Sequence, residues 1–440
     1  CTSALKRSTS LTSMSSTNRT ASSAPDRMGG TVVPALGTVP RVGDDSASTA
    51  AWLAAGLAGL TGRADGPPLL PSAATVEAIV ALVGAAPVDE PLLLLGERAA
   101  LAGRTRAGST SCGGSARLVF AADGWVAVNL ARPEDTQLLP AWLLLGADPD
   151  DPWAAVAHAV RERPTGDLVP RAADLGLPVS ALGETSDRRP DGTDGRGGIV
   201  RTRVGERLPR AEPPLVVDLS SLWAGPLCSH LLGLRGARVV KVESTRRPDG
   251  GRQDETGFFD LLNHGKASVA LDLPSTYGLA RLRSLLRGAD VVIEGSRPRA
   301  LRGWGIDAET YLAMDDGPRV WLSVTGHGRT GTAAERVGFG DDAAVAGGLV
   351  VRDHDGPCFL ADAVADPLTG IAAAQAVEEA LAESGTWLLD AALARVAASV
   401  ARPGPAVPPS EPFPPRRARP IPGTARPLGA DTDAVLAGIE

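Results

Sequence analysis

The sequence lacks the features that mark membrane, disulfide-stabilised, zinc-binding and nucleic-acid-binding proteins. Its most apolar windows, residues 52–60 and 138–145, are well short of the ~20 residues that a membrane-spanning helix needs. The four cysteines are scattered and form no Cys-x-x-Cys pair, which favours a reduced, cytoplasmic compartment and argues against disulfides or a bound metal. A net charge of −7 without a broad basic face argues against a nucleic-acid partner.

Changes in composition divide the 440 residues, a length that allows about two or three domains. Residues 1–40 are rich in Ser and Thr, contain no apolar run of signal-peptide length and are expected to be disordered, with Met28 as a candidate start. Residues 186–213 and the Pro-rich residues 401–415 are predicted linkers. Strand-like and helical runs alternate over residues 214–400, which is typical of an α/β domain.

A strand–helix–strand unit is predicted over residues 215–244. Residues 215–219 are a short β-rich apolar run, residues 227–234 have helical apolar spacing, and residues 237–242 read as a second buried strand. A parallel βαβ unit accounts for all three. The turn before the helix reads Trp-Ala-Gly-Pro and the pattern Gly-x-Gly-x-x-Gly is absent, so a dinucleotide cofactor is not indicated.

A β-hairpin is predicted earlier in the chain, within an otherwise helix-rich region. Residues 117–130 contain two apolar runs on either side of an Ala-Asp-Gly turn at 122–124. A Ser-Cys-Gly-Gly loop, which holds Gly113 and Gly114, comes shortly before them. No histidine partner is evident for the cysteine of this loop, so we do not interpret it as a nucleophile.

Two segments of the chain resemble each other at an offset of 290 residues (355 − 65). Asp-Gly-Pro at 65–67 aligns with Asp-Gly-Pro at 355–357, and an apolar-periodic, Ala-rich helix follows in both. On this alignment Asp366 of the later copy corresponds to Val76 of the earlier one. The pattern predicts a duplicated element with a carboxylate in only one copy, and the alternative is a chance likeness of two Ala-rich helices.

Four motifs occur in order within one span of the chain and together resemble CoA-transferase family III (CaiB/BaiF), which includes formyl-CoA and carnitine CoA-transferases. They are the βαβ unit with Trp-Ala-Gly-Pro, LLNHGKASVALDL at 261–273, GADVVIEGSRPRALRGWGI at 288–306 and SVTGHGRTG at 323–331. The resemblance implies an α/β fold with a Rossmann-like parallel sheet and a smaller α+β domain, in an interlocked homodimer. It assigns 214–400 to the CoA-binding domain, 41–185 to a half like the small domain, and 401–440 to a linker and the family's C-terminal tail.

The resemblance also implies a nucleophile. Residues 360–381 match the segment in which the family carries its catalytic aspartate, which points to Asp366, with Asp362 as the fallback. Because Pro367 follows, Asp366 also reads as a helix N-cap, where the helix dipole favours its ionised form. The implied reaction moves CoA from an acyl-CoA to a carboxylic acid through aspartyl anhydride and aspartyl-CoA intermediates.

A set of CoA-binding residues follows from the same motifs. Their cations are expected to contact the CoA phosphates, and their glycines to bring backbone N–H groups close to tetrahedral intermediates. The set is Trp223, Ala224, Gly225, Asn263, Lys266, Arg297, Arg302, Gly113 and Gly114. CoA is expected as a substrate, and no permanently bound cofactor is expected.

The chain departs from the family order because the glycine loop and the small-domain part precede the CoA-binding part. We infer one complete site per chain, formed within one chain or between two. The donor and acceptor acids have no signature. A 2-methylacyl-CoA racemase of the same family is the nearest alternative, although residues 338–342 lack the histidine that it would carry there. A non-catalytic CoA-binding protein and, less compatibly, a nicotinamide dehydrogenase are the others.

Overall fold

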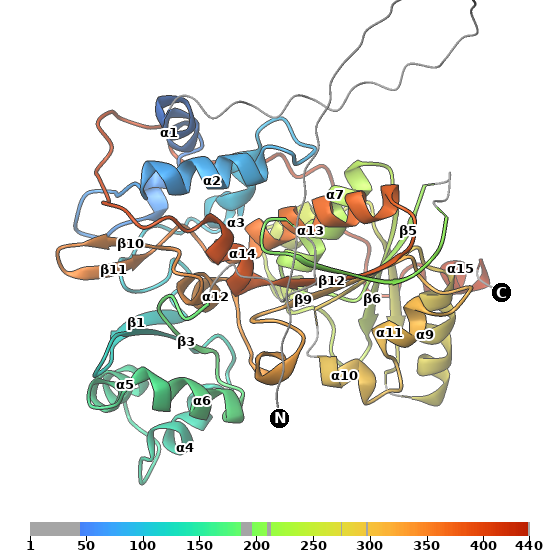
Figure 1. Cartoon of the computed structure of the whole chain (residues 1–440), viewed down its shortest axis with the longest axis horizontal. Coiled ribbons are helices and arrows are strands. Elements are labelled where there is room, and N and C mark those ends of the chain that lie inside the picture. Colours follow the sequence, from blue (N-terminus) through green and yellow to red (C-terminus); the bar gives the residue numbers. More distant parts are fainter. Residues whose placement is uncertain (1–44, 186–195, 209–212, 274, 296–297, 439–440) are drawn as a thin grey trace, which may run out of the picture. The chain divides into compact units, whose positions relative to one another are not determined.

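A seven-stranded sheet lies at the centre of the fold (Figure 1). The computed structural model describes residues 45–185, 196–208, 213–273, 275–295 and 298–438. The disorder predicted for residues 1–40 therefore lies outside the described residues. In spatial order the strands are β4 (Val200–Gly205), β12 (Thr386–Ala392), β9 (Val320–Thr325), β8 (Val291–Glu294), β5 (Leu215–Asp218), β6 (Arg238–Ser244) and β7 (Ala267–Leu271).

All neighbouring strands from β12 to β7 are parallel, as the alternating strand and helix runs predict. The predicted βαβ unit is confirmed as β5, α7 (Ala224–Leu234) and β6. The edge strand β4 is the exception, because it pairs antiparallel with β12. It lies inside the segment predicted as a linker, so that prediction is wrong for Val200–Gly205.

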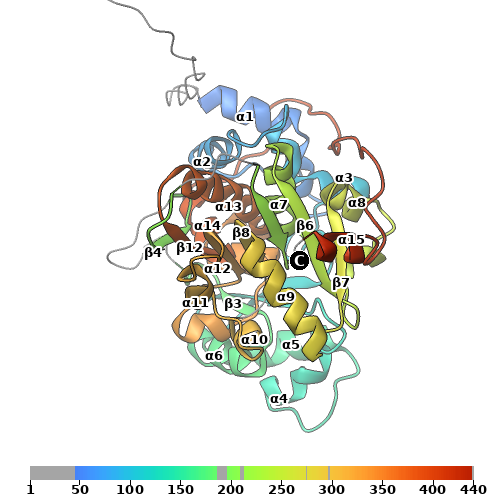
Figure 2. The same cartoon turned by 90° about the vertical axis from the view of Figure 1, so that its right-hand side faces the viewer.

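Two apolar cores cover the two faces of the sheet, because successive side chains of a strand point to opposite faces. On one face Val216 and Leu322 pack with α7, α13 (Ala365–Ala382) and α14 (Leu393–Val400). On the other face Val217 and Trp321 pack with a second set of helices. That set comprises α9 (Thr276–Gly288), α10 (Pro298–Arg302), α11 (Ala308–Leu312) and α15 (Thr432–Ala437). Figure 2 shows α9 and α15 beside β7.

A smaller antiparallel sheet confirms the predicted hairpin. β1 (Ala116–Phe120) and β2 (Trp125–Asn129) pair across the Ala-Asp-Gly turn, and β3 (Val179–Ala181) adds to β2. Trp142 lies fully buried in the core that this sheet shares with three helices. These are α4 (Leu139–Leu143), α5 (Pro152–Arg161) and α6 (Thr165–Leu175). This part, lower left in Figure 1, is the α+β element expected from the resemblance.

The two segments that resemble each other lie against each other. The helix of the first segment, α2 (Ala73–Val83), packs on that of the second, α13 (Figure 1). Arg63 donates to Asp353 at 2.7 and 2.8 Å, and these residues are themselves 290 positions apart. The duplication stays a prediction. The remaining first-half elements are α1 (Asp45–Ala54), η1 (Leu57–Leu60), η2 (Pro91–Leu95) and α3 (Glu97–Leu101).

Short elements complete the described chain. They are η3 (Thr136–Leu138), η4 (Gly250–Gln253), α8 (Phe258–Asn263), η5 (Gly331–Glu335), α12 (Gly340–Ala346), β10 (Val350–Asp353) and β11 (Gly356–Phe359). No helix in the described part of the chain combines the length and apolarity needed to span a membrane. The predicted domain boundaries, the homodimer and the cytoplasmic location stay predictions.

A buried ionic network holds the turn between β5 and α7. The Asp218 side chain is fully buried and accepts hydrogen bonds from Ser229 Oγ at 2.5 Å and from Ser220 N at 2.9 Å. Lys266 Nζ lies 3.4 Å from the same carboxylate, and Lys241 Nζ donates to the carbonyl of Ser220 at 2.9 Å. This network fixes the loop that leads to Trp223.

We expect Asp218→Asn to destabilise the protein by about 3–5 kcal/mol, because it leaves a buried lysine without its counter-charge. The matched change is Asp272→Asn, which removes the exposed ion pair with Arg246. It should cost less than about 1 kcal/mol. Unfolding followed in urea would measure both, and equal losses in the two variants would contradict the importance of the buried network.

Candidate active site

A cavity of about 1090 Å³ opens at the carboxyl ends of the parallel strands. The strand order reverses between β5 and β8, since β6 and β7 lie to one side and β9 and β12 to the other. Open α/β sheets bind ligands at such a switch point. The cavity is lined by the loops that follow β5, β6, β8 and β9, by residues 334–339 and by Asp366.

Asp366 lies in the first turn of α13, one residue after the helix begins, and it is partly exposed. The N-cap is Val364, so the prediction that Asp366 caps the helix is wrong. No described residue donates a side-chain hydrogen bond to its carboxylate. A Cβ atom built on Gly340 would lie 2.5 Å from Asp366 Oδ2, so the backbone of α12 passes directly beside the carboxylate. The side chain is thus free to meet a ligand in the cavity.

The pKa of Asp366 is raised to about 7, mainly by burial and also by the nearby carboxylates of Asp341, Asp342 and Asp362, while Arg98 lowers it. Burial thus outweighs the helix dipole, which is expected to favour the ionised form. A carboxylate with a raised pKa is a stronger base and nucleophile once it has lost its proton. Such a shift is what a catalytic carboxylate near neutral pH requires.

Asp362, the fallback nucleophile, has a different environment. Its side chain is fully buried and accepts two hydrogen bonds from Arg98, at 2.9 and 2.7 Å. Arg104 Nη1 lies 3.4 Å from the same carboxylate. Although burial opposes it, the two arginines hold the pKa of Asp362 below its usual value. Asp362 is therefore committed to ion pairs, and Asp366 is the carboxylate that remains available.

The turn that carries Asp362 into α13 has an unusual backbone. Ala361 and Ala363, on either side of Asp362, have φ angles of 54° and 43°. Such left-handed conformations are costly for residues other than glycine and gather at functional sites. Asp341 Oδ1 accepts a hydrogen bond from Ala363 N at 3.0 Å, which helps to hold the turn.

The glycine loop lies beside this turn. Cys112 Sγ donates to the carbonyl of Ala361 at 3.4 Å, and a Cβ atom on Gly113 would lie 3.5 Å from Arg104 Nη1. Gly114 has a φ of 81°, which favours glycine. Burial raises the pKa of Cys112 beyond the range of a reactive thiol, in keeping with the interpretation that it is not a nucleophile. The contact of Gly113 and Gly114 with a substrate stays a prediction.

Three of the predicted CoA-binding residues line the cavity, namely Trp223, Ala224 and Gly225. Gly225 is required by close packing, because a Cβ atom there would lie 2.1 Å from Ser220 Oγ. The Trp-Ala-Gly-Pro turn thus brings the start of α7 against the loop after β5.

Lys266 and Asn263 make hydrogen bonds to other residues of the chain. Lys266 is buried, and its Nζ donates to the Pro226 carbonyl at 2.8 Å, to Ser229 Oγ at 2.7 Å and to Asn263 Oδ1 at 3.0 Å. Asn263 is also buried and donates to the carbonyl of Phe259. Since these contacts occupy the ammonium group, the pair supports the turn before α7 in this structure, and a phosphate contact for Lys266 stays a prediction.

Of the predicted arginines, Arg302 is about half exposed and donates to Asp307 at 3.1 Å, while Arg297 lies outside the described residues. The sequence reasoning missed another cation. Arg247 follows β6, is exposed, lines the cavity and has no ion pair with any described residue. Its position shortly after a predicted buried strand, observed as β6, was the available signal.

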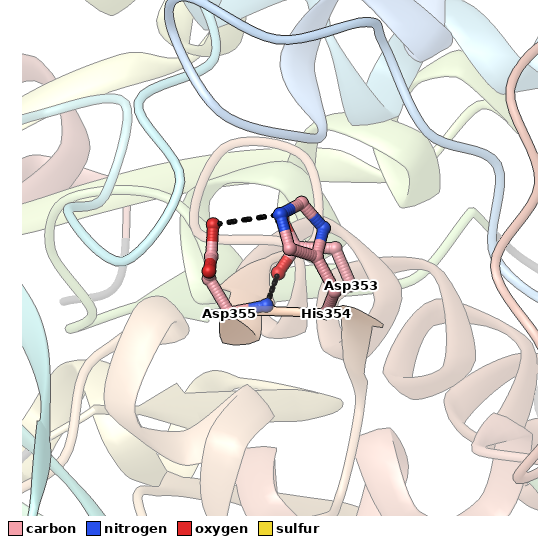
Figure 3. A group of neighbouring side chains, drawn as sticks. All are labelled: Asp353, His354 and Asp355. Carbon is pink, nitrogen blue, oxygen red and sulfur yellow. Dashed lines mark hydrogen bonds and ion pairs between the residues drawn. The ribbon is translucent and has the colours of Figure 1, made fainter.

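Asp353, His354 and Asp355 form the one described group with metal-ligating side chains close together, within 4.8 Å (Figure 3). Arg63 pairs with both carboxylates, at 2.7 Å to Asp353 and 3.5 Å to Asp355. His354 lies 3.2 Å from Asp355, and its side chain is 87% exposed. Because Arg63 already contacts both carboxylates, we interpret the group as an ion-pair cluster of the β10–β11 hairpin.

His327 lies in the loop after β9 and is buried. A Cβ atom built on Gly338 would lie 3.1 Å from His327 Nε2. Gly338 is two residues before Gly340, the glycine beside Asp366. Burial lowers the pKa of His327 to about 3, so its ring is neutral at physiological pH.

Part of the chain is similar to known proteins. Residues 214–402 match the family model described as CoA-transferase family III. The chain is 32% identical over 200 residues to succinate–glutarate CoA-transferase of Agrobacterium fabrum, covering 40% of this chain and 48% of that protein. It is 33% identical over 141 residues to succinyl-CoA–D-citramalate CoA-transferase of Chloroflexus aurantiacus, covering 30% and 35%. A solved CAIB/BAIF family protein from Brucella suis shares 29% identity at a TM-score of 0.40, covering 44% of this chain and 56% of that one.

The site defines an α/β protein with a cavity carboxylate at the switch point of a parallel sheet. Residues 214–402 match the model of CoA-transferase family III, which confirms the resemblance predicted from the four motifs. The α/β fold class is confirmed as well. The chain spans about half the length, or less, of the two curated relatives named above.

We expect Asp366→Asn to stabilise the protein. Between the usual pKa of 3.8 and the folded value of about 7, the folded state holds a proton that the unfolded state has lost, so stability falls as pH rises through this window. Asparagine cannot ionise and avoids this loss. We expect a gain of about 1–2 kcal/mol near pH 8 that shrinks towards pH 5, measured by thermal unfolding.

The matched variant is Asp362→Asn, which should destabilise the protein by about 3 kcal/mol because Arg98 loses its buried partner. A stabilised Asp362→Asn variant, or an Asp366→Asn variant whose gain does not depend on pH, would contradict the assignment of the two environments.

Proposed function

We propose that this protein is an enzyme that transfers CoA from an acyl-CoA to a carboxylic acid, with Asp366 as the nucleophile. The observation that carries the proposal is the carboxylate itself. It is open to the cavity at the sheet's switch point, has no hydrogen bond from another described side chain, and has a pKa raised to about 7. The match of residues 214–402 to the family model supports the same reaction class.

In the proposed reaction an Asp366 oxygen attacks the thioester carbonyl, and the carbon–sulfur bond breaks to give a mixed anhydride and CoA thiolate. The thiolate then attacks the aspartyl carbonyl of the anhydride, which releases the first acid as a carboxylate and leaves an aspartyl-CoA thioester. The acceptor carboxylate attacks this thioester and forms a second anhydride while the thiolate leaves. The thiolate finally attacks the acceptor's carbonyl, which gives the new acyl-CoA and restores the Asp366 carboxylate.

The relatives suggest where to begin with substrates. Their names specify succinyl-CoA as donor, or succinate and glutarate as the exchanged acids. We propose dicarboxylic acids as the first acceptors to test. Arg132 and Arg336 line the same cavity, where they are paired with Asp135 and Glu184, so a second carboxylate would have to share these cations.

The experiment that tests the nucleophile is chemical trapping. Wild-type protein incubated with succinyl-CoA and then treated with hydroxylamine or borohydride should carry a modification at Asp366, read by mass spectrometry of the peptides. Asp366→Asn should lose the modification and at least about 10³-fold of the exchange rate, as expected for removal of a covalent nucleophile. Exchange at an undiminished rate in this variant, or modification at another residue, would refute the proposal.

Arg247 is proposed to contact a CoA phosphate. We expect Arg247→Ala to raise KM for the acyl-CoA about tenfold with little change in kcat, since a charged hydrogen bond contributes about 1.5 kcal/mol. The matched control is Arg238→Ala, because Arg238 is exposed at the opposite end of the same strand, β6. Steady-state kinetics measures both, and equal KM values for the two variants would exclude Arg247 from the CoA site.

A racemase remains the second candidate because of His327. Racemisation needs two proton-transfer groups, and this neutral histidine lies beside Gly338 while Asp366 lies beside Gly340. Turnover of a chiral 2-methylacyl-CoA without any acceptor acid, abolished by His327→Ala, would favour the racemase over the transferase.

A further inference from the structure

We propose that Arg98, in the first half of the chain, is a positioning residue that completes the active site within the same chain, by holding the Asp362 carboxylate and the Trp223 ring in place beside the cavity of Asp366. This inference rests on the proposed function and adds a residue that lies outside the matched family segment, 214–402.

Arg98 contacts Asp362 through two hydrogen bonds. Arg98 Nε donates to Asp362 Oδ2 at 2.9 Å and Nη2 donates to Oδ1 at 2.7 Å. A fork of this kind fixes the orientation of a carboxylate as well as its position. Asp362 sits between two alanines with positive φ, four residues before Asp366. The guanidinium of Arg98 therefore anchors the strained turn from which the nucleophile projects.

The second contact is with the cavity wall. The guanidinium of Arg98 lies over the Trp223 ring, 4.5 Å from its centroid, and Trp223 lines the cavity at the start of α7. A stacked guanidinium restrains an aromatic ring by both dispersion and charge. One side chain thus joins the turn before α13 to the turn before α7, the two segments that border the cavity nearest Asp366.

Glu97, the residue before Arg98, fixes the helix that carries Arg98. The Glu97 side chain is fully buried and accepts hydrogen bonds from Arg419 Nε at 2.8 Å and Nη2 at 2.9 Å. The C-terminal tail therefore ties α3 in place, and α3 presents Arg98 to the site. Support of this kind keeps the side chain of Arg98 in a single geometry.

The positive charge of Arg98 also affects the pKa of Asp366. Asp341, Asp342, Asp362 and Asp366 gather around the site, and Arg98 and Arg104 are the cations that approach this group from the first half. Of the two, Arg98 makes the shorter and better-formed contacts. The positive charge of Arg98 lowers the pKa of Asp366, in opposition to burial and to the other carboxylates.

The test uses the full-length protein and the pH dependence of kcat/KM. We expect Arg98→Gln to move the acidic limb of the profile to higher pH by about one unit or more, and to reduce kcat/KM about 100-fold near neutral pH. Arg98→Lys keeps the charge but not the fork, so its limb should stay near that of the wild type while kcat/KM falls about tenfold. Arg417→Gln, at the exposed pair with Glu90, should leave both unchanged.

An unmoved limb in Arg98→Gln would show that Arg98 is merely structural and would overturn the proposal. If Arg98→Gln does not fold, Arg98→Lys tests the proposal instead, because an unchanged kcat/KM in Arg98→Lys would also overturn the proposal. A wild-type protein without transfer activity would instead refute the proposed function, so the two failures are distinguishable.

Mixed dimers of two variants test whether each site takes Arg98 from its own chain. Asp366→Asn and Arg98→Gln chains carrying different tags are expressed together and purified through both tags. If each site takes Arg98 from its own chain, no mixed species exceeds the activity of Arg98→Gln alone. If Arg98 came from a partner chain, a mixed dimer would contain one intact site, and recovery of up to half of the wild-type activity would overturn the proposal.

Discussion

The candidate site depends on a group of carboxylates that the fold buries together. Asp341, Asp342 and Asp366 have pKa values raised to about 6, 7 and 7 by burial, while Asp362 is kept ionised by Arg98. Concentrating carboxylates in this way opposes folding, since each ionised group repels the others. It also yields one carboxylate that is both basic and exposed to a cavity. Stability and reactivity at Asp366 are thus two consequences of the same arrangement.

The parallel sheet determines where this arrangement can meet a ligand. The reversal of strand order between β5 and β8 leaves a crevice, and Gly225 and Gly295 allow the backbone on its two sides to approach Ser220 closely. The buried network around Asp218 and Lys266 then fixes the loop from Ser220 to Trp223. The cavity wall is therefore rigid on the side of the sheet, and the first half of the chain supplies the opposite support.

Local patterns in the sequence predicted the βαβ unit, the hairpin and the helix that carries Asp366, because the residues that determine each are close together in the chain. They could not predict the role of Lys266, since the same lysine could meet a phosphate or a buried Asp218, which is 48 residues away. Arg98 was missed for the same reason, as its partner Asp362 is 264 residues away. β4 was missed because an antiparallel edge strand needs only one neighbour, β12, which comes much later in the chain.

The pairing of Glu97 with Arg419 has a consequence for synthesis on the ribosome. The two residues are 322 positions apart, and Glu97 is buried as a carboxylate whose described counter-charge arrives only with the tail. A nascent chain that has emerged as far as α13 therefore already contains Asp366 and the strand-end loops before it, while Glu97 in its first half still lacks the partner that it has when buried, Arg419. Folding of the first half is expected to be completed last, although it is translated first.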